Sequence, residues 1–548
     1  MKLNKFTVLA LAGIMAASCS DIDNQLPEGG ALTTGQVQDA TDAIPERTQA
    51  TFSGMFSMMG KPGATWSSGG NASRADDFGF ISAAISLDFE GADMVGMNSD
   101  YNWFSPASEL STRDANYANP YMRYVIPYRQ IGLANQIIET IPEDTENPES
   151  MNMRAQACAI RAFDYLSLAP YFQFADKAHF DEPCIPLLDG KNGFAENPRA
   201  SVRAVYESII TDLNWAIDHL TAERTDKGKI NKNVALGLRA RANLFLGNFA
   251  EAAADAAAAM EGYTPASMED LSVPSFYSIN DPNWIWGIPL TEDMVLSRPM
   301  CTACSWMCAF AGLSYTAYAQ LTPQINVLLY LQIPDTDVRK HWWLDEDLYS
   351  PLLDKVSWNG VTGVGISTLT IDDVKDTYLP YTNVKFGMKA GVGTEINNND
   401  WPLMRVEEMI LIQAEGLAKS GKAAEAEQIL TNFVKTYRDP QYKRSPERTL
   451  EDEIWFQRRV ELWGEGFFTG DVKRLGKHIV RFHEDVESNF PDGFKFNVRA
   501  DDGWMNLRFP QTEKDNNRGI VDNEGGQQPI PGQHPELRDG VTDVIPQE

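Results

Sequence analysis

The 548-residue sequence is short of positive charge. It has 47 lysines and arginines against 76 aspartates and glutamates, which gives a net charge of −29 at pH 7. Proteins that bind a nucleic-acid backbone need basic patches that displace counterions, so this function class is excluded. Adsorption to anionic membrane surfaces is disfavoured for the same reason. Any attachment to a membrane must therefore be covalent or inserted.

The usual signatures of an enzyme are also missing. The six histidines show no His-Glu-x-x-His spacing, and the chain has neither a Gly-x-Ser-x-Gly elbow nor a glycine-rich phosphate loop. Glu461 and Glu465 form a carboxylate pair one helical turn apart, so both point the same way. A glycosidase needs a carboxyl group on either side of the scissile bond. We expect the two glutamates to make structural ion pairs, and we expect no catalysis and no cofactor.

Cysteine is scarce, with six in the chain. Cys301, Cys304 and Cys308 lie close together but supply three thiols, not the four of a structural zinc or iron–sulfur site. If Cys19 is lipidated, five cysteines remain, and an odd number cannot all pair. Small buried thiols, a local disulfide and a metal site are the alternative interpretations. The apolar surroundings at 301–312 favour buried thiols, so we predict no metal.

Long apolar runs are confined to the N-terminus. Lys2 and Lys5 precede the apolar stretch 6–17, which is typical of a secretory signal peptide. Small residues stand directly before Cys19, as in the lipobox, where the cysteine is acylated and becomes the first mature residue. We expect residues 1–18 to be removed. Since no run of roughly 18 apolar residues follows, the lipid on Cys19 is the only membrane anchor that we expect.

Helical periodicity dominates the rest of the chain. Apolar and small residues recur at steps of three and four, as in helices that pack closely on one another. Pro142 marks the end of the first segment. The predicted helical segments are 121–141, 151–172, 201–220, 233–260, 405–419 and 422–437.

Two of these segments share the small-residue spacing of a tetratricopeptide repeat. Small residues let one helix pack on the next, and a glycine makes the turn between them. The second set begins 174 residues after the first, so the pattern predicts a helical scaffold interrupted by a large insertion, not a contiguous solenoid. The two sets are Ala240, Gly247, Ala252 and Ala259, and Ala414, Gly421 and Ala426.

The predicted insertion is rich in proline and glycine and holds many of the tryptophans. A rigid helical frame that presents aromatic loops is a common way to build a binding surface. We expect the tail after Asp515 to be irregular. The expected division is a signal peptide at 1–18, a lipidated tether at 19–50, an N-terminal helical region at 51–264, the loop-rich insertion at 265–400 and a C-terminal region at 401–548.

Several stretches resemble motifs of the SusD/RagB family. Residues 161–166 read Arg-Ala-Phe-Asp-Tyr-Leu, similar to the Arg-Ala-aromatic-x-Tyr helix of that family. Residues 457–474 are similar to its C-terminal signature "ER-x-x-EL-x-x-EG-x-R-x-x-DL-x-R". Residues 509–516 resemble its closing element "IP-x-x-E-x-x-x-N", and residues 335–339 also fit.

Two positions depart from this signature. Gln457 stands where the family usually has glutamate, and Phe468 where it usually has arginine. We therefore expect one salt bridge of the family's fold to be absent. Because both positions look structural, we do not expect these changes to alter function.

The resemblance implies a mainly α fold: a SusD-like, tetratricopeptide-like helical scaffold with a large loop-rich insertion. It also implies a lipid-anchored protein of the outer membrane, facing the cell exterior. Such a protein captures an oligo- or polysaccharide and delivers it to a TonB-dependent, SusC-like transporter. The alternative is a tetratricopeptide-type scaffold, or a binder of peptide or another nutrient at the same transporter.

Sugars are bound by flat aromatic rings stacked on their C–H faces and by polar side chains that reach their hydroxyls. In the resembled family these groups lie on loops from the first hundred or so residues and from the insertion. We expect at least one of Trp66, Trp103 and Trp306 to be an exposed platform, whereas Trp284 and Trp286 look like a buried strand. The candidate ligand-binding residues are Trp66, Arg74, Asp76, Asn102, Trp103, Trp306 and Tyr315.

Overall fold

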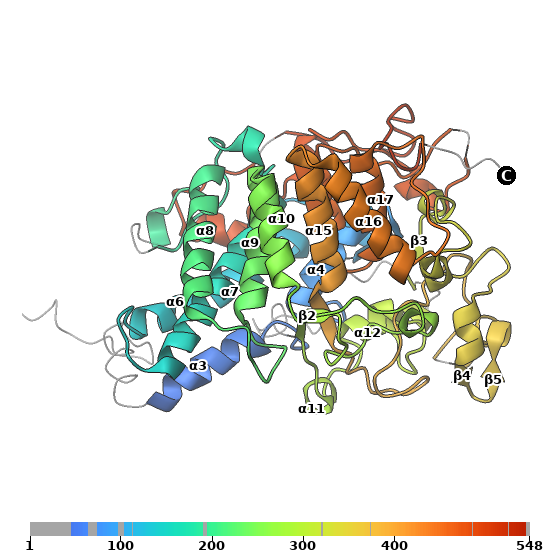
Figure 1. Cartoon of the computed structure of the whole chain (residues 1–548), viewed down its shortest axis with the longest axis horizontal. Coiled ribbons are helices and arrows are strands. Elements are labelled where there is room, and N and C mark those ends of the chain that lie inside the picture. The colour runs from blue at the N-terminus through green and yellow to red at the C-terminus, as the bar shows by residue number, and fades with distance from the viewer. Residues whose placement is uncertain are drawn as a thin grey trace, which may run out of the picture.

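Long helices stand side by side and form the frame of the molecule (Figure 1). The computed structural model describes residues 45–63, 74–96, 104–111, 113–189, 194–318, 322–372, 374–484, 486–523 and 525–543. Each helix of the frame packs on the next one in the row. The row consists of α6 (Ala118–Thr140), α7 (Pro148–Phe172), α8 (Val202–His219), α9 (Lys232–Leu246), α10 (Phe249–Ala259), α15 (Val406–Lys419), α16 (Ala423–Tyr437) and α17 (Leu450–Glu461).

Local sequence signals set the ends of these helices. The Asn147 side chain accepts hydrogen bonds from the first turn of α7, with Pro148 at the first helical position. The Asn231 side chain caps α9 in the same way. At the other end of α9, Gly247 adopts a left-handed conformation (φ 72°) that a side chain would strain, and the chain turns into α10. The predicted segment 233–260 is thus a helix pair that turns at the expected glycine.

The two tetratricopeptide-like pairs, α9–α10 and α15–α16, are neighbours in space although 174 residues separate their motifs. Gly416 explains how closely α15 approaches α10. A Cβ at this position would come within 2.4 Å of the carbonyl oxygen of Phe249 and 3.0 Å of the Ala253 side chain. Because the two helices are in direct contact, the intervening chain loops out between them. The prediction of an interrupted helical scaffold is confirmed.

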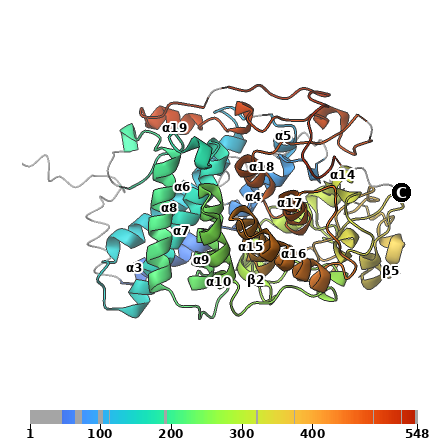
Figure 2. The same ribbon diagram turned by 45° about the horizontal axis from the view of Figure 1, so that its top comes forward.

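A smaller set of helices packs around this row. α4 is buried almost throughout and lies against α5, α6 and α18 in the centre of the molecule (Figure 2). α3 packs along α6. The bounds are α3 (Pro45–Ser57), α4 (Phe80–Phe89), α5 (Phe104–Ser108), α18 (Phe468–Leu475) and α19 (Gln511–Asn516).

The stretch 265–400 carries only short elements within its described residues. Within this stretch β4 pairs with β5, whereas β2 and β3 pair with strands outside it, β2 with β6 and β3 with β1; all three pairs are antiparallel. Its helices span at most five residues. The elements are β1 (Met94–Val95), β2 (Trp284–Ile288), β3 (Gln324–Ile325), β4 (Ser357–Trp358), β5 (Val361–Thr362), β6 (Trp401–Arg405), α11 (Glu292–Val295), α12 (Ala303–Met307), α13 (Tyr315–Tyr318) and α14 (Val327–Tyr330).

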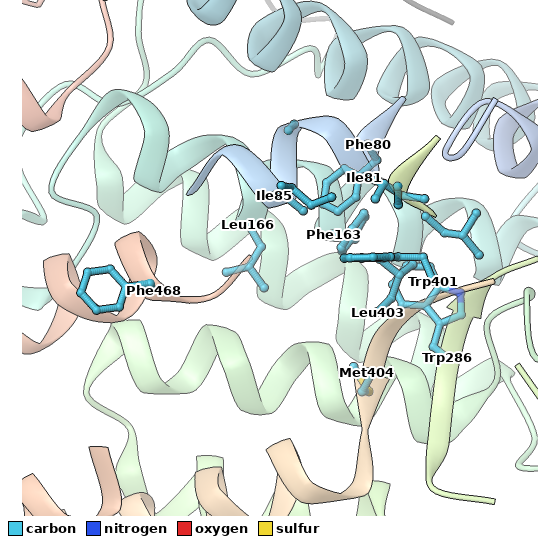
Figure 3. Close-up of a cluster of buried hydrophobic side chains, with 14 of the residues drawn as sticks. Phe80, Ile81, Ile85, Phe163, Leu166, Trp286, Trp401, Leu403, Met404 and Phe468 are labelled. Carbon is cyan, nitrogen blue, oxygen red and sulfur yellow. The ribbon is translucent and has the colours of Figure 1, made fainter. Parts of the chain in front are cut away.

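The pair β2–β6 joins the insertion to the helical frame. Ile288 faces Trp401 in its register, and every residue of β2 is buried. In the core around it, Phe80 of α4 packs on Phe163 of α7, and Phe163 meets Trp286 of β2 edge-to-face at 4.9 Å (Figure 3). The prediction of a buried strand at Trp284 and Trp286 is confirmed.

The tail runs across the molecule without regular structure. After α19, the described residues up to 543 contain neither a helix nor a strand. In Figure 2 this segment passes over the frame near α18 and α5. Among the described residues, no helix combines the length and the apolar character that crossing a membrane requires.

Candidate functional site

Half of the residues predicted to bind ligand or lipid lie outside the described part of the chain. These are Cys19, Trp66, Asn102 and Trp103. The other predicted site residues are Arg74 and Asp76 from the first segment and Trp306 and Tyr315 from the second.

The structure brings these two segments together at Trp306. The indole N–H of Trp306 donates a hydrogen bond of 2.9 Å to the carbonyl oxygen of Ala75, which is 231 positions away in sequence and stands between Arg74 and Asp76. The thiol of Cys301 also contacts the carbonyl oxygen of Arg74, at 3.1 Å. Two segments that were proposed separately therefore share one surface.

Trp306 is the inner member of a stacked aromatic pair. Its side chain is only 2% exposed, and the Phe104 ring packs on it edge-to-face at 4.8 Å. Trp306 is therefore not an exposed platform. Trp66 and Trp103 lie outside the described residues, so the expectation that at least one of the three is exposed stays a prediction. A buried indole needs a partner for its N–H as well as apolar neighbours, and Ala75 and Phe104 supply both. The ring of Tyr315, which is partly exposed, stacks on Trp306 at 4.4 Å with an interplanar angle of 26°.

Arg74 and Asp76 form a two-pronged ion pair beside this stack. Two N–H groups of the Arg74 guanidinium donate to the Asp76 carboxylate at 2.8 and 2.7 Å. The Arg74 side chain is 26% exposed and that of Asp76 only 2%. Both oxygens of the buried Asp76 carboxylate accept hydrogen bonds from Arg74, and ligand contact by either residue stays a prediction. The guanidinium is the member of the pair that faces the surface.

Polar residues near α12 hold Tyr315 in place, and the sequence analysis did not identify them. The backbone N–H of Tyr315 donates to the Ser305 hydroxyl at 2.9 Å, and the Ser314 hydroxyl donates to the Ser305 carbonyl oxygen at 3.0 Å. The side chain of Thr302 caps α12 by accepting from the Ser305 N–H. Threonine is a preferred N-cap residue, so Thr302 is a sequence signal that could have located the start of this short helix.

The cysteine cluster consists of buried, unpaired thiols. All five cysteines in the described part of the chain are free and buried. Burial raises the pKa of the Cys301 thiol to about 11, and burial together with Cys308 raises that of Cys304. The Cys304 sulfur lies 3.1 Å from the Met388 sulfur. The thiols of Cys301 and Cys304 are therefore protonated at neutral pH. The buried cysteines pack as small apolar groups, as the buried-thiol interpretation expected.

The glutamate pair lies in a buried network of ion pairs. Glu461 contacts the guanidinium groups of Arg438, Arg405 and Arg339 at 2.7, 3.1 and 3.3 Å. Glu465 contacts Arg405 and the ammonium of Lys385 at 2.8 Å each. The expectation of structural ion pairing is confirmed.

Two family models match the chain. One, described as "Starch-binding associating with outer membrane", matches residues 83–244, and the other, described as "SusD family", matches residues 329–529. Together they cover more than half of the sequence. The chain belongs to the SusD/RagB family.

Solved structures of SusD-like proteins share the fold of this family member. A SusD-like carbohydrate binding protein from Bacteroides vulgatus is 22% identical, with a TM-score of 0.66 over 87% of this chain and 97% of that one. A SusD superfamily protein from Bacteroides thetaiotaomicron is 19% identical, with a TM-score of 0.66 over 87% and 99%. Surface glycan-binding protein A from B. thetaiotaomicron, solved with laminarihexaose, is 17% identical, with a TM-score of 0.62 over 87% and 99%.

At these identities the likeness establishes the fold alone. A comparison of the sequence with curated proteins finds no significant match. The predicted SusD-like fold, mainly α with a tetratricopeptide-like frame, is confirmed.

One departure from the SusD signature, Gln457, puts an amide where the family usually has a carboxylate. Gln457 accepts a hydrogen bond through its side-chain oxygen from Arg339 and donates through its side-chain nitrogen to Glu453 at 3.0 Å. The amide thus replaces the expected salt bridge by a hydrogen bond from the charged guanidinium of Arg339 to a neutral acceptor. Arg339 has two ionic partners, Asp337 at 2.6 Å and Glu461 at 3.3 Å.

Proposed function

We propose that this protein is a cell-surface lipoprotein that captures an oligo- or polysaccharide and delivers it to a SusC-like, TonB-dependent transporter. The proposal that the protein binds a glycan rests on one observation: both predicted binding segments meet at one surface. There, Tyr315 stacks on the buried Trp306, and the Arg74–Asp76 pair flanks the residue to which Trp306 donates. Family membership and the relative solved with laminarihexaose support the same proposal.

The chemistry of this surface suits a sugar. A tyrosine ring offers a flat apolar area for the C–H face of a pyranose, and its hydroxyl can reach a neighbouring oxygen. Stacking on Trp306 holds the ring in one orientation, which lowers the entropy that binding must remove. The Arg74 guanidinium supplies N–H donors for ring hydroxyls, and Asp76 orients it. We propose that Trp66, Asn102 and Trp103 complete the site.

The location and the division of the chain belong to the same proposal. The lipid on Cys19 anchors the protein to the outer membrane with its binding surface outside the cell. Residues 19–50 act as the tether, the two helical regions at 51–264 and 401–548 as the frame, and the insertion at 265–400 as the carrier of binding loops. Binding and transfer then need no catalytic group, and we propose that the protein is not an enzyme.

Titration calorimetry on the chain without its first 19 residues tests the glycan proposal. The panel contains laminarihexaose, starch oligosaccharides and other neutral polysaccharides, with peptides of similar size as the comparison. We expect at least one glycan to bind, and Trp103→Ala to abolish its retention in an affinity gel without lowering the melting temperature by more than a few degrees. Binding of peptides alone would favour the scaffold or peptide-binding alternative.

A further inference from the structure

A cavity of about 120 Å³ lies between the two parts of the chain that the family models match. Its wall comes from α4, α7 and α9 on one side and from β6, α17, α18 and the turn between these two helices on the other. Figure 3 shows Phe80, Phe163 and Leu403 of this wall approaching one another from α4, α7 and β6. The apolar lining includes Phe80, Leu87, Phe163, Leu166, Phe245 and Leu403.

One charged group in the wall has unused hydrogen-bonding capacity. Arg458 is 4% exposed; its Nε donates to Asp471 at 2.5 Å, and its Nη2 lies 4.0 Å from Glu408. Its Nη1 is buried and has no hydrogen-bond partner among the described residues. The guanidinium also lies 5.2 Å from the ring centre of Phe467, a partly exposed residue of the same wall.

A buried donor without an acceptor destabilises the protein, more strongly when the donor is charged. A ligand that places an acceptor oxygen against Nη1 removes this penalty, and a carboxylate forms the strongest hydrogen bond with a guanidinium. The other charged side chains of the wall are already engaged in ion pairs; they are Arg241, Glu465, Asp471 and Arg474. The rest of the lining is largely apolar, so it does not suit the many hydroxyls of a sugar. A cavity of roughly 150 Å³ accepts a benzene ring, which sets the size of the apolar body.

We propose that this cavity binds a small amphiphilic carboxylate. The apolar body, one ring or a chain of roughly five carbons by that comparison, lies among the phenylalanines and leucines, and the carboxylate accepts from Nη1 of Arg458. The site is independent of the glycan proposal, because neither Tyr315 nor Arg74 lines the cavity.

Gly470 provides a way to fill the cavity without disturbing its wall. It lies inside α18 and lines the cavity, and a Cβ there would meet only the Phe245 ring, at 3.9 Å, an ordinary contact distance. Leucine at this position should project into the cavity and favour the helix. Gly132, inside α6, has no atom within 4 Å of the equivalent Cβ and does not line the cavity, so Gly132→Leu is the matched control.

Titration calorimetry with hexanoate, hexanol and acetate tests the proposal on the wild-type chain and these variants. We expect saturable binding of hexanoate, no measurable binding of acetate, and binding of hexanol weaker by about tenfold, which corresponds to about 1.4 kcal/mol. Gly470→Leu should weaken hexanoate binding by at least about tenfold, and Gly132→Leu should leave it unchanged. Failure of hexanoate to bind, or equal binding by Gly470→Leu, would overturn the proposal.

The role of Arg458 has its own test. Arg458→Lys keeps a cation opposite Asp471 but lacks Nη1, so it should lose the preference for hexanoate over hexanol. A smaller cavity of about 20 Å³ also borders Arg458 and has room for one water molecule. If the wild-type chain binds hexanol as tightly as hexanoate, Arg458 does not bind the carboxylate of the ligand and the proposed ligand class is wrong. This result can be obtained even if Arg458→Lys does not fold.

Discussion

The carboxylate of Asp88, at the end of α4, accepts a hydrogen bond of 3.2 Å from the backbone N–H of Phe468, the first residue of α18. It also accepts one of 2.8 Å from the N–H of Gly466. Phe468 stands where the SusD signature has an arginine. Within the described residues Asp88 makes no ion pair, and its two hydrogen bonds here come from backbone N–H groups. Burial raises the pKa of Asp88 to about 7.

This raised pKa predicts how stability changes with pH. In the unfolded chain Asp88 ionises near its ordinary value of 3.8, whereas in the folded protein it stays protonated up to about pH 7. Between these values the folded state binds the extra proton, so the contribution of Asp88 to stability falls as pH rises from about 4 to 7. In Asp88→Asn this dependence is absent. The melting temperature of the wild type minus that of Asp88→Asn should therefore be higher at pH 4.5 than at pH 8.

Scanning fluorimetry at the two pH values measures this difference. The comparison cancels the pH dependence of the groups that do not interact with Asp88, provided that Asp88→Asn leaves the fold intact, which circular dichroism checks. If the melting temperature of the wild type minus that of the variant stays constant or rises with pH, Asp88 ionises normally in the folded protein.

Asp164 should be replaceable by an apolar residue with a gain in stability. It lies in the middle of α7, is 0% exposed, and neither of its oxygens has a hydrogen-bond partner among the described residues. Burial raises the pKa of its carboxyl group well above the usual range. An unsatisfied buried polar group costs about 1–3 kcal/mol, so Asp164→Leu should raise the free energy of unfolding by an amount of this order, as measured by denaturant titration at pH 7. Asp164→Asn keeps a polar group there and should give little gain; a loss of stability in Asp164→Leu would contradict the prediction.

The two stacked aromatic rings should respond differently to truncation. Tyr315→Ala removes the partly exposed ring and should abolish or strongly weaken glycan binding, with a small change in melting temperature. Trp306→Ala empties a buried site and should cost about 3–5 kcal/mol of stability, with any loss of binding following from the loss of structure. Calorimetric titration of the glycan and thermal unfolding of both variants separate the two effects. If Tyr315→Ala binds as the wild type does, Tyr315 is not part of the site.

Glu461 should be a major contributor to stability at neutral pH. Burial by itself would raise its pKa, but Arg438, Arg405 and Arg339 outweigh burial and hold the pKa below its usual range. A lowered folded-state pKa gives stability that is present above the unfolded value of about 4.3 and lost as pH falls below it. Glu461→Gln leaves the buried arginines short of a partner and should cost about 3–5 kcal/mol at pH 7.

Denaturant titrations at pH 7 and pH 3.5 measure this effect. The gap between Glu461→Gln and wild type should narrow at the lower pH, because wild-type Glu461 then loses part of its advantage. Glu427 pairs with Arg444 on the surface, with both side chains substantially exposed. Glu427→Gln is therefore the control, and its stability should change by less than about 1 kcal/mol.

Much of the helical frame could be predicted because its signals are local. The periodicity at 151–172 and 422–437, the proline after Asn147 and the glycine at 247 act within a few turns of the chain. The structure has α7 at Pro148–Phe172 and α16 at Ala423–Tyr437. Where a predicted helix boundary differs from the observed one, the difference is one to three residues, which is the distance over which a capping residue acts.

The candidate site could be predicted only in outline. Composition and motif resemblance led to the two segments around residues 74–76 and 306–315, and the structure brings both to one surface. Which indole faces water could not be predicted, since the burial of Trp306 depends on Phe104 and on the carbonyl oxygen of Ala75. Both partners are about 200 or more positions away in sequence.

The amino-acid sequence by itself determined the helices, their turns, the family and the structural role of Glu461, because each of these follows from spacing within a short window. Only the tertiary structure decided that α10 packs on α15, that Tyr315 lies outside Trp306, and that Arg458 borders a cavity with an unused N–H. These features depend on contacts between segments distant in sequence, and their energies come from burial and from partners that no local pattern records.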